Sequence, residues 1–267
     1  MTITRVDVVN TVDSGGVASR VLTKPNVANI AADDWAFLAI GGNLNPSPAI
    51  TQLPPGFTLL GARVTDGSGP NTHVDIYTRK WVAGDIAGLA AEDWTLATGA
   101  NTDKVQASVI TYRGLHATTP VLDFAPWNEG DTVAGSHLRI GGANASMTGC
   151  VLLTYVFDRL TSGVTYTQVG SSDTAVINTI GPGTNAMTQL VLESGVVLPG
   201  RYWRDLTLSA ASVDAAGMML VLRDAGSKSL QGTPKLKYWN GSAWVLVNKL
   251  KRYNGTSWDR PRLRPIA

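Results

Sequence analysis

Short runs of apolar residues recur along the chain upstream of residue 226, and each is bounded by Gly, Pro, Asn, Asp or Ser. The run around residues 73–79 alternates, with Val74, Ile76 and Thr78 at one parity, which is typical of a strand with two distinct faces. Residues 35–40 are apolar at both parities, which predicts a strand covered on both faces. Strands spaced roughly every 10 to 20 residues, without long helical patterns between them, predict an all-β sandwich or barrel.

One segment departs from this strand pattern. In the stretch GDIAGLAAEDW, the apolar residues Ile86, Leu89 and Ala90 recur at helical spacing. The segment is short and contains Gly88, which weakens a helix interior. We therefore predict no more than one or two helical turns there.

The expected organisation is a body followed by a tail. We predict a jelly-roll-like β-sandwich body over residues 1–225, a linker of small and polar residues over 226–234, and a tail over 235–267. The stretches EDWTLATG and RYWRDLTLS resemble each other within the body, which suggests an old duplication with halves of about 1–120 and 121–225. The sequence leaves open whether the body is one sandwich or two.

The tail contains one phrase twice, as KLKYWNGSAW and KLKRYNGTSW. Asn-Gly pairs favour tight hairpin turns because both residues tolerate a positive φ. Two aromatic residues flank each turn, and a hairpin places such residues opposite one another. The turn and flanking residues are Trp239, Asn240, Gly241 and Trp244 in the first hairpin, and Tyr253, Asn254, Gly255 and Trp258 in the second.

The tail is too small to shelter its own aromatic rings, because an isolated two-stranded hairpin is at best marginally stable. We expect the hairpins to dock on the body, on another copy of the chain or on another protein, and we expect a threefold arrangement of copies. Residues 235–267 carry eight basic residues and one acidic residue, a net charge of +7, which leaves −5 for the rest of a chain of net +2. The last basic residues alternate with proline, so we predict an extended segment on an acidic partner surface. They are Arg260, Arg262 and Arg264.

Nucleic-acid binding is an alternative for this tail, because Lys and Arg interleaved with aromatic residues can bind phosphates and stack on bases. Alternating Lys residues also protect edge strands from unwanted pairing. We therefore favour protein contact over nucleic-acid contact.

The tail and the first part of the body resemble one family. The aromatic-Asn-Gly-Ser/Thr-x-Trp phrase resembles the carboxy-terminal hairpins of tail and fibre proteins of tailed bacteriophages. The ordered segments VLTKPNVANIAADDWAFLAI, LPPGFTLLGARV, VDIYTRKWVAGD and ASVITYRGL resemble a β-sandwich domain of minor tail proteins from phages of actinobacteria. The matching positions are Thr23, Lys24, Pro25, Asp34, Pro54, Pro55, Gly56, Phe57, Trp81, Tyr112, Arg113 and Gly114.

The resemblance implies a structural component of a phage virion, most often a minor tail or tail-tip protein, with a head decoration or fibre protein as the alternative. It implies assembly with copies of itself and with other virion proteins, and contact with the host surface. It carries no catalytic residues, so we expect no enzyme activity and no cofactor. The expected location is the virion tail, after synthesis in the host cytoplasm, because the chain shows neither a signal-peptide pattern nor a membrane-spanning apolar run.

Candidate reactive residues are scattered. His73, His116 and His137 have no metal-ligand spacing to each other or to Cys150, so we predict histidines at the surface or in loops, a buried, inert thiol and no metal site. The acidic pairs Asp33–Asp34 and Glu92–Asp93 precede tryptophans that begin strands. We interpret these acids, and Glu129 with Asp131, as turn or surface residues rather than a glycosidase pair.

The competing function is that of an adhesin, which would bind cell-wall glycan through the sandwich loops. The best candidate for an exposed aromatic contact is Trp127, because FAPWNEGD reads as a polar loop. Trp35, Trp94 and Trp203 stand at strand starts and are predicted to be core residues.

Overall fold

The computed structural model divides into two compact units, Met1–Ser229 and Leu230–Ala267, which we call the body and the tail. The residues that the structure describes are 2–12, 18–44, 50–60, 64–65, 71–98, 104–128, 137–160, 165–170, 173–181, 186–209, 215–227, 237–239, 244–246, 252–253 and 258–259.

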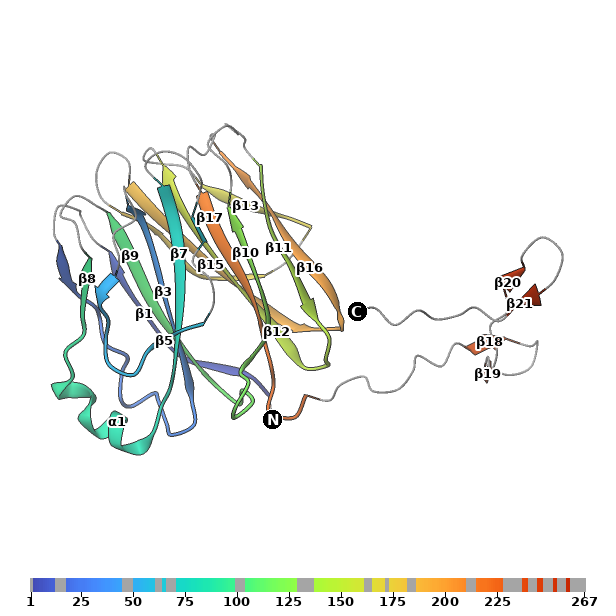
Figure 1. The fold of residues 1–267 in the computed structure, drawn as a ribbon, viewed down its shortest axis with the longest axis horizontal. Helices are drawn as coiled ribbons and strands as arrows, with labels where there is room; N and C mark the ends of the chain where they lie inside the picture. The colour runs from blue at the N-terminus through green and yellow to red at the C-terminus, as the bar shows by residue number, and fades with distance from the viewer. Residues whose placement is uncertain are drawn as a thin grey trace. The chain divides into compact units, whose positions relative to one another are not determined.

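The first part of the body forms a large sheet and a small sheet, both antiparallel (Figure 1). The first large sheet has the order β1-β9-β3-β7-β5, and β6 also pairs with β7. The first small sheet has the order β2-β8-β4. The strands are β1 (Thr4–Val12), β2 (Ser19–Val21), β3 (Trp35–Leu44), β4 (Ile50–Gln52), β5 (Thr58–Leu59), β6 (Val64–Thr65), β7 (Asn71–Lys80), β8 (Thr95–Thr98) and β9 (Val105–Arg113).

The second part of the body repeats this arrangement. The second large sheet has the order β10-β17-β12-β15-β14, and the second small sheet has the order β11-β16-β13. The strands are β10 (Val121–Asn128), β11 (His137–Ala145), β12 (Cys150–Leu160), β13 (Tyr166–Val169), β14 (Thr174–Ile180), β15 (Ala186–Val197), β16 (Gly200–Leu208) and β17 (Ala215–Leu222).

The two parts share one topology. In the first part, β1 pairs with β9, β2 with β8 and β3 with β7. In the second part, β10 pairs with β17, β11 with β16 and β12 with β15. This nested pairing across two sheets is the wrapping of a jelly roll. The predicted jelly-roll-like, all-β fold is therefore confirmed, and the body contains two such sandwiches in sequence. The stretches EDWTLATG and RYWRDLTLS fall on β8 and β16, which occupy equivalent places in the two small sheets.

The two sandwiches pack through their large sheets, so that the body is a stack of four β layers. Phe37 of β3 and Ile110 of β9 share one apolar cluster with Tyr155 and Phe157 of β12. The covered second face of the first large sheet explains why β3 is apolar at both parities: Leu38 and Ile40, which alternate with Phe37, pack in the core of the first sandwich. The two-faced burial predicted for residues 35–40 is confirmed at Ala36 to Ile40, each 0% exposed.

Polar side chains also bridge the two large sheets. The Gln189 Nε2 atom donates to Ser108 Oγ at 2.5 Å, and the Tyr112 hydroxyl donates to Glu193 Oε2 at 2.5 Å. Gly41 lies against Phe157, and a Cβ atom at residue 41 would overlap the Phe157 ring. The glycine therefore allows the two sheets to approach each other here.

The predicted helical segment is confirmed. It forms α1 (Ala83–Gly88) and η1 (Leu89–Ala91) between β7 and β8. The carbonyls at its end are bound by the Lys24 ammonium, which donates to the oxygens of Leu89, Ala90 and Glu92 at 3.1, 2.9 and 2.6 Å. Charge near the carboxyl end of a helix is favourable when it is positive, and Lys24 fixes this short segment on the first sandwich.

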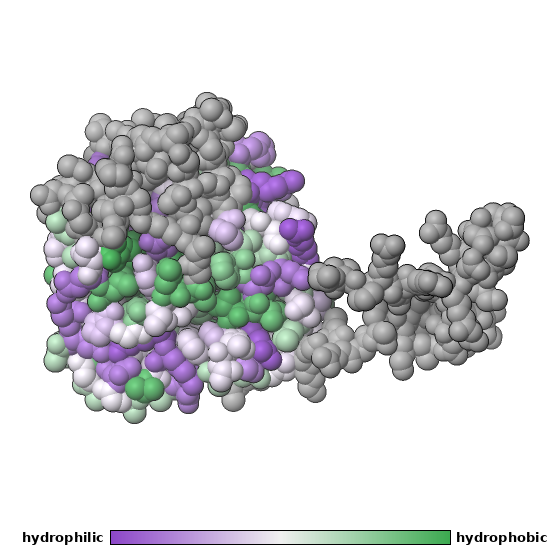
Figure 2. All heavy atoms as spheres, in the orientation of Figure 1, coloured by the Kyte–Doolittle hydropathy of each residue, from purple (hydrophilic) through white to green (hydrophobic). Residues whose placement is uncertain are grey.

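Apolar side chains gather in a band across the middle of the face shown in Figure 2, over β5 and β10. Leu59 of β5 is 52% exposed, and residues 121–125 of β10 are half-buried. β5 and β10 are edge strands of the two large sheets, so the band lies where both sheets end.

The tail contains two β-hairpins, as predicted. β18 (Lys237–Trp239) pairs with β19 (Trp244–Leu246), and β20 (Arg252–Tyr253) pairs with β21 (Trp258–Asp259).

Candidate functional site

The register of the tail hairpins brings the predicted aromatic positions together. Trp239 is the backbone partner of Trp244, and Tyr253 is the partner of Trp258. Each pair is the innermost backbone pair of its ladder. The remaining predicted interface residues lie outside the described residues; these are Asn240, Gly241, Asn254, Gly255, Arg260, Arg262 and Arg264.

The loop predicted around Trp127 is wrong. Trp127 belongs to β10, where its backbone partner is Gly217 of β17. Pro126 is tolerated in this strand because β10 is an edge strand and does not need every backbone donor. The side chain of Trp127 lies outside the described part of the structure.

The core prediction for the strand-start tryptophans holds for Trp94 and fails for Trp203. Trp94 is 1% exposed, whereas Trp203 on β16 is 47% exposed; Trp35 is half-buried against the core between the large sheets. The reason for the difference is strand parity, since alternate residues face opposite sides of a sheet. Trp94 precedes the buried Leu96 by two residues and shares its face, while Trp203 precedes the buried Leu206 by three residues and lies on the opposite face.

Trp203 carries an arginine beside its ring on this open face. The Arg201 guanidinium carbon lies 5.4 Å from the indole centroid, within the range of a cation–π contact. The Arg201 Nε atom donates to the Gly142 carbonyl at 3.0 Å. Among the described residues, no carboxylate lies within ion-pair distance of Arg201, so its charge is available to a partner.

A glycine bulge in β11 lies next to Trp203. The register shifts between Gly141 and Ala143, and Gly141 is the backbone partner of Trp203. Gly141 and Gly142 have φ values of 121° and 102°, in the region that only glycine adopts readily. A Cβ atom at Gly141 would lie 2.8 Å from the Tyr202 carbonyl oxygen. Bulges change the direction of side chains in sheets. Because both residues of this bulge are glycines, no side chain of β11 stands between its backbone and the indole.

The same face continues into a shallow hollow of about 410 Å³, lined by His137, Leu138, Arg139, Val169 and Asp205. Arg139 donates two hydrogen bonds to the Asp205 carboxylate, from Nε to Oδ1 at 2.6 Å and from Nη2 to Oδ2 at 3.1 Å. The hydrogen bond from Arg139 lowers the pKa of Asp205 below its usual value. We call the surface formed by His137, Arg139, Arg201, Trp203 and Asp205 the Trp203 face. Sequence reasoning missed it because only strand parity separates an outward tryptophan from a buried one.

The residues that carried the family resemblance have structural partners in the first sandwich. Trp81 stacks on Trp94 with centroids 6.4 Å apart and an interplanar angle of 6°, and Phe57 meets Trp94 edge-on at 5.8 Å. The Arg79 guanidinium lies 4.2 Å from the Trp81 centroid and donates two hydrogen bonds to Glu92, of 2.8 and 2.6 Å. The three rings belong to the apolar core of the first sandwich.

The acidic pairs are also engaged in ion pairs or turns. Asp34 receives two hydrogen bonds from Arg113, of 3.0 and 2.8 Å, and Asp33 pairs with Lys80 at 2.7 Å. Asp93 accepts from the backbone nitrogen of Thr95 at 3.0 Å, as a turn-forming residue does. Glu129 and Asp131 lie outside the described residues.

The histidine prediction is wrong for one of the three residues. His137 is exposed and His116 lies in a loop, but His73 is 1% exposed on β7. The predicted alternation along β7 is present, but both faces of this strand are covered. The polar residues that alternate with Val74 and Ile76 are therefore buried as well. Cys150 is buried as predicted, and burial raises the pKa of its thiol.

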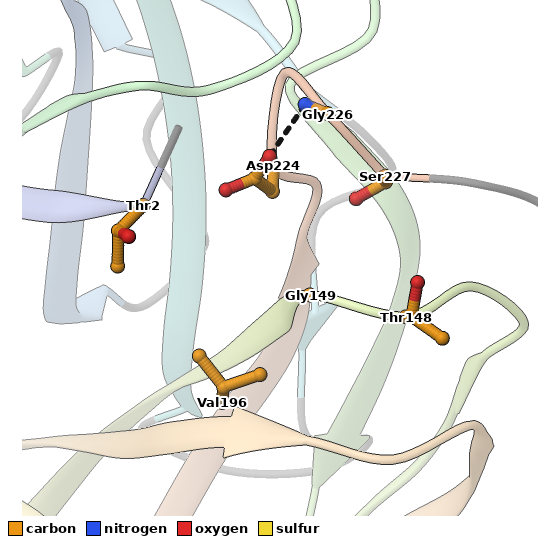
Figure 3. A pocket seen from close by; sticks show the side chains of 7 residues that line it. All are labelled: Thr2, Thr148, Gly149, Val196, Asp224, Gly226 and Ser227. Atoms are coloured by element: carbon orange, nitrogen blue, oxygen red, sulfur yellow. Dashed lines mark hydrogen bonds between the residues drawn. The ribbon is translucent and has the colours of Figure 1, made fainter.

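A second hollow of about 290 Å³ lies beside the end of the body (Figure 3). It is lined by Thr2, Thr148, Gly149, Val196, Asp224, Gly226 and Ser227. The Asp224 carboxylate turns back to accept a hydrogen bond from the Gly226 backbone nitrogen at 2.5 Å. This contact shapes the turn through which the chain leaves the last strand, and we assign the hollow to that turn.

No group of three or more His, Cys, Asp or Glu side chains that could hold a metal ion is found within the described ranges. No helix in the described part of the chain is long and apolar enough to cross a membrane. Comparison with family models, curated proteins and solved structures finds no match for this chain.

Proposed function

We propose that the chain is a structural component of a phage virion, in the tail or tail tip, and that it assembles with other subunits through its carboxy-terminal hairpins. The observation that carries the assembly role is the pair of hairpins, each with two aromatic residues as the innermost backbone partners. The virion setting is supported by the sequence resemblance alone.

The size of the tail supports docking. Its strands are only two or three residues long, and it forms a compact unit separate from the body. Hairpins of this length do not bury large aromatic rings or persist alone in water. A surface of another subunit that covers them would supply the missing apolar contact.

The body supports the role of a rigid element. Its two sandwiches share a continuous apolar core between their large sheets, so they are expected to behave as one block. The apolar band over β5 and β10 (Figure 2) is a surface that a neighbouring subunit could cover.

Light scattering at micromolar concentration tests the assembly role. We expect the full chain to form a closed oligomer, with a trimer as the specific expectation, and a chain that ends at Ser229 to be a monomer. The truncated chain retains the whole body unit. Equal monomer masses and equal melting temperatures for the two chains would refute assembly through the tail.

A matched pair of glycine variants tests the turns themselves. Gly241→Val with Gly255→Val should cost at least about 1 kcal/mol per site, since valine resists a positive φ, and should weaken the oligomer. Gly195→Val is the control, because open space surrounds its Cβ position. A double variant that assembles and melts like the wild-type chain would show that the Asn-Gly turns do not form.

The virion setting is tested separately by mass spectrometry of purified particles from a phage that encodes the chain. Recovery of the chain in stoichiometric amounts with tail proteins is expected. Its absence from mature particles would refute the virion role and leave the assembly result intact.

A further inference from the structure

The Trp203 face differs from the rest of the described body surface because it combines an exposed indole with an arginine that no described carboxylate neutralises. Trp203 is 47% exposed, and the Arg201 guanidinium lies 5.4 Å from its centroid. Neither residue is needed to fill a core, since the buried side chains of β16 are Arg204, Leu206 and Leu208.

The residues next to Trp203 add hydrogen-bonding groups whose positions the ion pair between Arg139 and Asp205 fixes. Asp205 follows Trp203 by two residues on the same strand face, and Arg139 holds its carboxylate with bonds of 2.6 and 3.1 Å. The hollow of about 410 Å³ lies over this ion pair. His137 and Val169 complete its lining. An apolar ring, oriented polar groups and a shallow hollow thus lie side by side on one sheet.

This combination matches the chemistry of an acidic sugar. A pyranose presents a face of C–H groups that packs on an indole, and its hydroxyls exchange hydrogen bonds with carboxylate and guanidinium groups. A sugar carboxylate is recognised by arginine, whose planar donors fit two carboxylate oxygens. Because Arg139 already neutralises Asp205, the one charge on this face that no described carboxylate neutralises is that of Arg201, which favours an anionic partner.

We propose that the Trp203 face binds a glycan chain that carries uronic acids, with one sugar ring on Trp203, its carboxylate on Arg201 and hydroxyls of the next sugar on Arg139 and Asp205. This site lies on the open face of the second small sheet, and the inference does not depend on assembly through the tail.

Biolayer interferometry with the full chain tests the proposal. The probes are immobilised polygalacturonate, alginate and hyaluronate, with galactan and dextran as neutral polymers. We expect saturable binding to at least one uronate polymer and a loss of affinity with added salt, because the contact with Arg201 is ionic. Trp203→Ala should weaken this binding by about tenfold or more, and Arg201→Gln should reduce it while removing its salt dependence.

Val21→Ala is the matched control, because Val21 is 74% exposed on the first small sheet. It should bind like the wild-type chain, and all three variants should keep the wild-type melting curve and oligomeric mass. Absence of binding to every uronate polymer would overturn the proposal, as would binding that Trp203→Ala leaves unchanged. Equal binding to neutral polymers with no effect of Arg201→Gln would overturn the acidic specificity.

Discussion

The two sandwiches of the body have the same strand order but use their small sheets differently. In the first sandwich, Trp94 lies under the small sheet and packs on Trp81. In the second sandwich, Trp203 of the equivalent strand lies outside, next to Arg201. Trp94 precedes the buried Leu96 by two residues, whereas Trp203 precedes the buried Leu206 by three. This difference of one residue places the Trp203 indole on the outer face of its strand.

This comparison separates what the fold requires from what it permits. Both β8 and β16 keep an inward leucine, Leu96 and Leu206, each 0% exposed, so the inward position is required by packing. The described tryptophans of the first sandwich are buried or half-buried, so none of them matches the exposed Trp203. A large aromatic residue that the topology does not need is better explained by a contact outside the chain.

Replacement of the two tryptophans is the strongest test of the comparison. Trp94→Ala should destabilise the body by about 3–5 kcal/mol, because it leaves a large cavity in the core. Trp203→Ala should cost less than about 1 kcal/mol, as surface substitutions generally do. Urea unfolding of both variants measures the difference. Similar costs would mean that Trp203 supports the fold and would remove the basis for a separate role.

A substitution at the junction tests whether the two sandwiches are one block. Gly41→Ala places a Cβ atom in the space of the Phe157 ring, and overpacking of this kind costs about 1–3 kcal/mol. Gly84→Ala is the control, since nothing lies within 4 Å of its Cβ position. We expect a single, shifted unfolding transition. Two separate transitions in calorimetry would show that the sandwiches are independent.

The ion pairs of the two sandwiches are expected to respond differently to acid. The hydrogen bond from Arg79 holds the pKa of Glu92 below its ordinary value of 4.5. A lowered pKa in the folded state means that the stabilisation is present above the unfolded value and is lost as the pH falls through the folded value. Glu92→Gln should therefore cost about 1–3 kcal/mol at neutral pH, and its difference from the wild-type chain should shrink below about pH 4.5. Urea unfolding between pH 7 and pH 3 measures both effects.

The corresponding change in the second sandwich should be the smallest. Asp205 also has a lowered pKa through its hydrogen bond from Arg139, but the Arg139 side chain is 71% exposed, and exposed ion pairs contribute little. Asp205→Asn should leave the pH dependence of unfolding close to that of the wild-type chain. An effect as large as that of Glu92→Gln would indicate that the Trp203 face is part of the structural core.

The fold class could be predicted from the sequence because its signals are local. The alternation along β7, the short helical segment and the strand pairs of the two tail hairpins depend on residues close together in the chain. The stacking of the two sandwiches could not be predicted, since it depends on contacts such as Gly41 with Phe157, far apart in sequence. Burial of His73 followed from the same long-range packing.

The candidate site was less predictable than the fold. The aromatic partners in the tail follow from turn chemistry, and their register confirms that part. Trp203 was assigned to the core because a tryptophan at a strand start gives no sign of its face until the register is known. The polar stretch FAPWNEGD predicts a loop at Trp127, whereas the residue belongs to the edge strand β10.

The last strand of the body has a mechanical consequence. β17 lies inside its sheet, paired along its length with β10 on one side and β12 on the other, and the chain runs from it toward the tail. A force transmitted through the tail would load both ladders of β17 in parallel, so that extraction requires many bonds to shear together. The carboxy-terminal segment therefore leaves the body from a strand that two ladders hold.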